Sequence, residues 1–120
     1  MLIIKKNILL LTEGVASPTG NYFNKESITW NPDEKIPVFW VFNYELDMFV
    51  GFLNDIHRED DKILGSFSME IDDPNEPFSQ YLKQFEVALA LRDVTYDDSG
   101  AISSARIYAG GFVPVHIKLD

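Results

Sequence analysis

Residues 36–71, with the sequence IPVFWVFNYELDMFVGFLNDIHREDDKILGSFSMEI, decide the fold class of this chain. The stretch holds three runs rich in β-branched and aromatic residues, separated by polar residues that favour turns. Val38 to Tyr44 is apolar at nearly every position, which is typical of a strand covered on both faces. Phe49 to His57 and Lys62 to Ile71 alternate better, and we expect them to form a hairpin around a turn at residues 58–61.

The rest of the chain continues the β pattern. Leu2 to Thr12 is β-rich, and the Pro and Gly residues of Gly14 to Asn24 indicate a loop. Apolar residues at helical spacing predict one short helix over Phe78, Tyr81, Leu82 and Phe85. A second hairpin, 87–96 with 101–109, and a final strand at 112–119 follow. We therefore expect a single domain spanning residues 1–120, mainly β with one or two short helices, as a small antiparallel β-barrel or a strongly curved sheet.

Composition limits the classes of partner. The 120 residues carry a formal net charge of -9, and sites for nucleic acid or anionic membranes need the opposite charge. The acidic residues gather in predicted turns, where they favour solubility, and their spacing does not match a calcium loop. The chain has no cysteine, no pattern typical of a signal peptide and no apolar run long enough to span a bilayer. We expect no metal, no cofactor, no nucleic acid and no membrane among its ligands.

The order of these segments resembles the prohead proteases of tailed bacteriophages, which belong with the herpesvirus assemblin-like serine proteases. The similarity lies in an opening loop, a strand with its turn and hairpin, a helix, and two later strands around an acidic turn. The corresponding segments here are LLTEGVASPTGNYFNKESI, PVFWVFNYELDMFVG with the hairpin to SFSMEI, FSQYLKQF, VALALRDVTYDDSG and ISSARIYAGGFVPV. The resemblance implies a prohead-protease-like fold.

The same resemblance implies that the catalytic triad is missing. The family histidine falls near Asn43 or Tyr44, the serine at Ala88 and the acidic residue near Ala109. A shift of a residue or two does not restore the triad. No histidine precedes residue 57, no serine lies between residues 79 and 99, and no acidic residue lies between residues 98 and 120. Loss of triad members abolishes most of the catalysis, so we expect a pseudoenzyme.

Other candidate groups are weaker. The predicted turn places His57 opposite Lys62, and Ser66 then lies about 13 Å along the strand, too far for a nucleophile and its base. His116 is expected to be a partly buried or edge histidine. The pair Gly110 and Gly111 lacks phosphate-loop spacing and indicates a bend or bulge. Arg92 and Arg106 are expected to lie opposite each other across the second hairpin, as surface residues.

The aromatic run is most simply core, as expected for strands covered on two faces. Its members are Phe39, Trp40, Phe42, Tyr44, Phe49 and Phe52. Met48 and Phe49 follow a polar turn, however, and with Tyr44 they form a candidate protein interface at that tip.

These features favour a non-enzymatic phage structural protein: a capsid decoration, minor capsid or assembly component in the virion or the bacterial host cytoplasm. Its expected partner is the major capsid protein or another virion protein, and an acidic surface suits basic patches on a shell. Homo-oligomerisation stays open. Two alternatives are an acidic, phage-encoded inhibitor of a host protein and a hydrolase with an unrecognised site.

Overall fold

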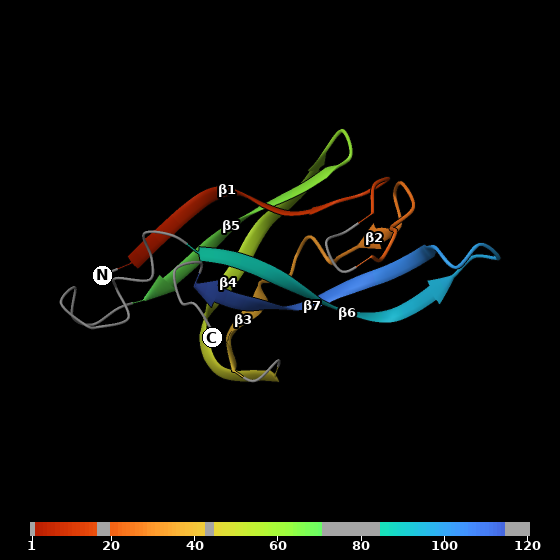
Figure 1. The fold of residues 1–120 in the computed structure, drawn as a ribbon. Coiled ribbons are helices and arrows are strands. Elements are labelled where there is room, and N and C mark those ends of the chain that lie inside the picture. Colours follow the sequence, from red (N-terminus) through yellow and green to blue (C-terminus); the bar gives the residue numbers. More distant parts are fainter. Residues whose placement is uncertain (1, 17–19, 43–44, 71–84, 115–120) are drawn as a thin grey trace.

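Seven β-strands form one sheet in the computed structural model, which describes residues 2–16, 20–42, 45–70 and 85–114 (Figure 1). The prediction of a mainly β fold is confirmed. The predicted helix lies outside the described residues except for Phe85, which begins a strand. The strands are β1 (Leu2–Thr12), β2 (Ile28–Thr29), β3 (Ile36–Phe42), β4 (Glu45–Glu59), β5 (Lys62–Glu70), β6 (Phe85–Tyr96) and β7 (Ile102–Pro114).

The sheet is mixed and does not close into a barrel. Its strand order is β1-β5-β4-β3-β7-β2, and β6 pairs with β7 as well. The hairpins are antiparallel as predicted, but β3 and β2 both run parallel to β7, so the prediction of a wholly antiparallel sheet is wrong. The outer strands β1 and β6 approach each other, although no ladder joins them in the described part. Hairpins follow from local sequence, whereas the docking of one hairpin on another depends on long-range packing.

Bulges bend three of the antiparallel strand pairs, β1–β5, β4–β5 and β6–β7. Asn7, Asp55 and Asp93 have φ angles of 57°, 51° and 54°, and each lies where the pairing register shifts. Asn and Asp tolerate this left-handed backbone better than most residues. A bulge adds one residue to one strand and increases its twist. These three polar residues therefore account for part of the strong curvature of the sheet.

The core lies on one face of this curved sheet, and Gly110 permits close packing at its centre. A Cβ atom on Gly110 would lie 3.1 Å from Val87 Cγ1 and 3.3 Å from both Leu53 Cδ1 and Val38 Cγ2. The glycine pair does not end a strand, because β7 runs without a break through both residues, so the predicted separate strand beginning at residue 112 is wrong. The largest fully buried core residues are Phe67, Phe112, Ile28, Leu53, Ile63 and Ile107.

The β4–β5 turn is shorter than predicted. Glu59 pairs with Lys62, which leaves a two-residue turn whose first residue, Asp60, has a φ of 53°. The prediction of a turn over residues 58–61 is wrong because Arg58, although charged, remains in β4 and finds a buried partner elsewhere in the chain.

Candidate protein-interaction surface

The face of the sheet opposite the core, here called the outer face, carries several large apolar side chains. Paired residues of neighbouring strands point to the same side of a sheet. Phe52 pairs with Pro37 on β3 and with Ser68 on β5, and Phe49 pairs with Phe39. Since Leu53 and Phe67 point into the core, these residues occupy the outer face.

Three of these side chains are rings in contact with one another. Together with Met48, the exposed neighbour of Phe49 on β4, they are here called the aromatic patch: Phe39, Met48, Phe49 and Phe52. Met48 is 57% exposed, Phe49 51% and Phe52 36%. The Phe49 ring lies edge-on to Phe39, with centroids 6.1 Å apart, and edge-on to Phe52, at 5.1 Å. Lys35 Nζ lies 5.7 Å from the centroid of the Phe52 ring. The rings hold one another in place, yet half of the surface of Phe49 stays accessible.

Irregular pairing between β3 and β4 turns Phe49 outward. Gly51 pairs with Val38, but the next partner of β3 is Phe49, so that Val50 is an extra residue on β4. In a regular strand Phe49 would share the core face of Gly51, because side chains alternate with a period of two. The bulge reverses this placement, and it is a feature that an alternating sequence pattern does not reveal.

The predicted interface residues are thus only partly described. Met48 and Phe49 are exposed, but they lie inside β4 and not at a tip. Tyr44 lies outside the described residues. Within the aromatic run expected in the core, the prediction is wrong for Phe52, which is exposed, whereas Phe49 is exposed as expected for an interface residue. Trp40 does pack against the core and stacks on Phe112 with centroids 5.8 Å apart. Phe52 and Phe39 are members of the surface that the sequence did not identify.

The positions matched to the protease triad carry no reactive group where they are described. Ala88 is an exposed residue of β6, and Ala109 on β7 is 2% exposed. Their partners are Gly111 and Ala90, which places the two alanines close together on one hairpin. Asn43 lies outside the described residues.

His57 and Ser66, considered above as a base and a nucleophile, do not lie opposite each other in the β4–β5 hairpin. His57 lies opposite Leu64 and not Lys62, so the predicted register is wrong, and Ser66 pairs with Asn54. The ring of His57 lies 2.8 Å from the carbonyl oxygen of Asp55 and 3.3 Å from Glu59 Oε1. The Asp55 carbonyl, assisted by Glu59, raises the pKa of His57. Both ring nitrogens therefore have local partners within β4.

The two arginines of the second hairpin are placed as predicted. Arg92 pairs directly with Arg106 across β6 and β7. The guanidinium of Arg92 lies 5.7 Å from the ring centroid of Tyr108. This cation–π contact stabilises Arg92 next to the like charge of Arg106.

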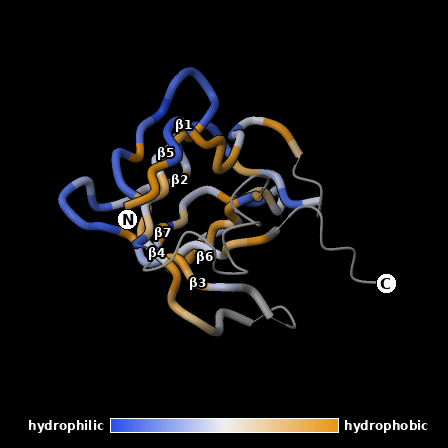
Figure 2. Tube along the Cα trace, turned by 90° about the vertical axis from the view of Figure 1, so that its left-hand side faces the viewer, coloured by the Kyte–Doolittle hydropathy of each residue, from blue (hydrophilic) through white to orange (hydrophobic). Residues whose placement is uncertain are grey.

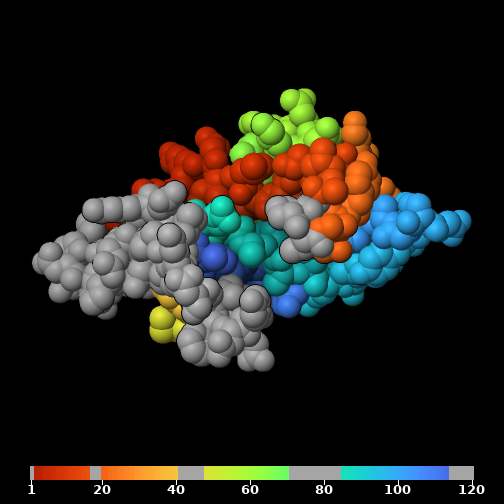
Figure 3. Space-filling view, in the orientation of Figure 1, coloured from red at the N-terminus to blue at the C-terminus, as the bar shows by residue number. Residues whose placement is uncertain are grey.

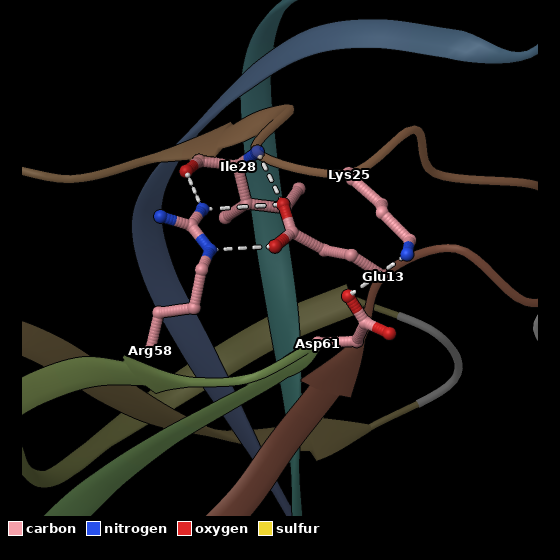
Figure 4. A network of polar contacts seen from close by, with 5 residues as sticks. All are labelled: Glu13, Lys25, Ile28, Arg58 and Asp61. Carbon is pink, nitrogen blue, oxygen red and sulfur yellow. Dashed lines mark hydrogen bonds and ion pairs between the residues drawn. The ribbon is translucent and has the colours of Figure 1, made fainter.

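A buried ion pair, which the sequence did not reveal, joins three distant segments (Figure 4). The carboxylate of Glu13, 1% exposed, accepts hydrogen bonds from Arg58 Nε at 2.7 Å, Arg58 Nη2 at 3.2 Å and the N–H of Ile28 at 2.9 Å. Arg58 Nη2 also donates to the carbonyl of Ile28 at 2.8 Å. We call Glu13, Ile28 and Arg58 the Glu13 junction. It ties the end of β1 to β2 and to the far end of β4.

The electrostatics of the junction keep both partners charged. Burial alone would raise the pKa of Glu13, but the hydrogen bonds and charge of Arg58 and the N–H of Ile28 outweigh it and lower that pKa below 4.5. The hydrogen bond to Glu13 in turn raises the pKa of Arg58. The guanidinium also lies 5.3 Å from the ring centroid of Trp30. With every charged oxygen bonded, the junction is structural in character.

Within the described ranges, no three His, Asp or Glu side chains lie close enough to share a metal ion. No helix of the described part is long and apolar enough to cross a bilayer.

No protein-family model, curated protein or solved structure matches the chain. The likeness to prohead proteases therefore stays a prediction from the sequence motifs.

Proposed function

We propose that this chain is a non-enzymatic protein-binding domain of a phage particle, a prohead-protease-like module that docks onto the major capsid protein or another virion protein. One observation carries the proposal: the aromatic patch is exposed on the outer face, while a separate core is fully packed behind it. Met and aromatic residues are the types enriched in the centres of protein interfaces.

The construction of the patch supports binding. Its residues lie on paired strands, and the edge-on contacts of Phe49 restrict the rotamers of three rings. Preorganised side chains lose little conformational entropy when a partner covers them, so more of the burial energy remains for affinity. The alanines at the triad positions and the local partners of His57 offer no comparable support for catalysis.

Co-sedimentation with particles tests the proposal. The particles are purified from the phage whose genome encodes the chain, and we expect the intact domain to sediment with them. Phe49→Ser should weaken binding at least about tenfold, because hot-spot aromatics commonly contribute more than 1.4 kcal/mol. Tyr96→Ser is the matched control, since Tyr96 is 65% exposed on β6 but lies away from the patch. Absence from the particles together with no co-sedimentation would overturn the proposal.

Catalysis has a separate test. A hydrolase with an unrecognised site would cleave denatured casein and react with a serine-directed phosphonate. Specific labelling with cleavage would replace the binding function by an enzymatic one.

The inhibitor alternative has one observation in its favour. Asn24 Nδ2 donates to Asp97 Oδ2 at 2.9 Å, and Lys25 Nζ lies 3.8 Å from Asp61 Oδ1, so two acidic turns meet the same short segment. Figure 2 shows the polar tip of the β4–β5 hairpin in blue, away from the apolar parts of β3 and β4. However, Asp97 also accepts bonds from Ser99 and from the N–H of Ala101, which makes it a turn-forming residue. A host enzyme inhibited by the wild-type chain and not by Asp98→Asn with Asp60→Asn would favour this alternative.

A further inference from the structure

The apolar surface continues from the aromatic patch to the edge of the sheet. Ile4 on β1 pairs with Ser68, which pairs with Phe52, which pairs with Pro37, so one row of outer-face side chains crosses four strands. Ile4 is 50% exposed and Leu2, two residues before it on the same face, is 58% exposed. Figure 3 shows β1, in red, along the surface of the molecule. We call this surface the four-strand face.

The middle of this face carries small side chains. Ser68 lies between Ile4 and Phe52 in the row, and Ser66, two residues earlier on β5, is 8% exposed. A hydroxymethyl group is much shorter than the side chains on either side of it. An apolar side chain of a partner can therefore contact Ile4 and Phe52 at once, above Ser68, where it would lose contact with water on both sides.

Acidic charge borders the same face. Phe39 pairs with Gly111, which pairs with Ala88, so Ala88 shares the outer face. Glu86, two residues before Ala88 on β6, is exposed on that face as well. Asp33 and Glu34 are both exposed and lie in the turn immediately before the strand β3.

Two lysines interrupt this acidic border. Lys35 lies over the ring of Phe52, and Lys6, two residues after Ile4 on β1, is exposed on the same face. The chain as a whole carries a charge of -9, so a second copy, nucleic acid or an anionic membrane would each bring charge of the same sign.

We infer that the four-strand face binds a protein surface with a basic rim and a projecting apolar side chain that sits over Ser68 between Ile4 and Phe52. This inference rests on the proposed function for its setting but goes beyond it, because it assigns β1 to the interface and defines the chemistry of the partner. Apolar contact provides the affinity. The basic rim provides the orientation and a fast, salt-dependent association.

The first test maps the site with defined peptides. The ¹⁵N-labelled full chain is titrated with two short synthetic peptides, one alternating Lys and Phe and the other alternating Glu and Phe. We expect the Lys–Phe peptide alone to shift the amide signals of Ile4, Phe52 and Ser68, and raising the salt from about 50 to about 300 mM should weaken it several-fold. Equal shifts with the Glu–Phe peptide, or shifts confined to the acidic turns at residues 60–61 and 97–98, would overturn the inference.

The second test uses two matched variants of one strand. Ile4→Ser should weaken binding of the Lys–Phe peptide, and of phage particles, about tenfold. Leu9→Ser is the control, because Leu9 is 52% exposed on the same strand but pairs with Leu64, beyond the bulge at Asn7. Equal effects of the two variants would contradict a site at Ser68.

The outcomes separate this inference from the proposed function. If particles bind the wild-type and Ile4→Ser chains equally at any salt concentration, the docking function is left intact. The inference that β1 belongs to the interface and that the partner has a basic rim is then refuted. If the particles do not bind but the Lys–Phe peptide maps to the four-strand face, the docking function is refuted and the inference about the chemistry of the partner stands. A dimer in light scattering that Ile4→Ser dissociates would overturn the inference in favour of a second copy as the occupant.

Discussion

The Glu13 junction and the aromatic patch lie toward opposite ends of β4, and each reverses the usual placement of its residues. Arg58, near the end of the strand, is bonded to a buried carboxylate, whereas Phe49, near its start, is an aromatic ring half in water. The junction has its partners inside the chain. Among the described residues, the patch is contacted by its own rings and Lys35, and Met48, Phe49 and Phe52 remain partly exposed to water.

The difference shows where each region contributes its free energy. A buried charge pair contributes little net stability, yet removal of one partner is costly because the other charge stays buried without compensation. Exposed apolar side chains contribute little to folding, and their free energy is released when a partner covers them. Substitutions in the junction should therefore change stability, and substitutions in the patch should change binding.

The largest expected effect comes from Glu13→Ala. It leaves the guanidinium of Arg58 and the N–H of Ile28 without their acceptor, so we expect a loss of about 3–5 kcal/mol in the free energy of unfolding. Urea denaturation followed by circular dichroism measures it. Glu59→Ala is the control, because Glu59 is exposed and its partner is the partly exposed His57. A loss below about 1 kcal/mol for Glu13→Ala would mean that the junction is no more than a surface ion pair.

Arg58→Lys should have a smaller effect. A lysine keeps the positive charge but cannot donate to Glu13 and to the carbonyl of Ile28 in the same planar geometry, nor stack as well on Trp30. We expect a loss of about 1–3 kcal/mol in the same urea titration. The matched change at Arg92, an exposed residue, should leave stability nearly unaltered, and equal losses at both positions would contradict the special role of Arg58.

Acid should weaken the junction gradually. The pKa of Glu13 is lowered in the folded chain, so its carboxylate stabilises the fold above the ordinary value of 4.5, and this contribution is lost as the pH falls below it. The pKa of Asp97 is lowered from 3.8 to about 2 by hydrogen bonds from Asn24 and Ser99, so its contribution is lost between those values. Thermal unfolding from pH 6 to pH 2 measures both. Glu13→Gln and Asp97→Asn should each flatten part of this pH dependence, and unchanged profiles would refute these assignments.

The same contrast separates what the sequence predicted from what it did not. The strands of both hairpins, the exposure of Met48 and the pairing of Arg92 with Arg106 follow from alternation and turn residues, which act over short distances. The parallel pairing of β3 with β7 and the bond between Glu13 and Arg58 join residues far apart in the chain. Alternation along a single strand contains no information about such contacts.

Bulges explain the remaining errors. A pattern with a period of two assigns Phe49 to the core, and one extra residue at Val50 is enough to reverse the assignment. The charged Arg58 looked like a turn residue because its acceptor is 45 residues away. The sequence thus predicted the strands of the candidate site and the exposure of Met48 and Phe49, but not the outward direction of Phe39 and Phe52.

The smallest expected effect on stability is that of Met48→Ser, and it is the sharpest test of the contrast. Met48 is 57% exposed, so its removal should change the free energy of unfolding by no more than about 0.5 kcal/mol. Binding to particles should nevertheless fall several-fold, because the side chain belongs to the surface that the partner covers. Urea titration and co-sedimentation of the same preparation measure the two quantities. A variant that loses stability as well as binding would show that the patch serves the fold, as the Glu13 junction does, and would remove the reason to regard it as a docking surface.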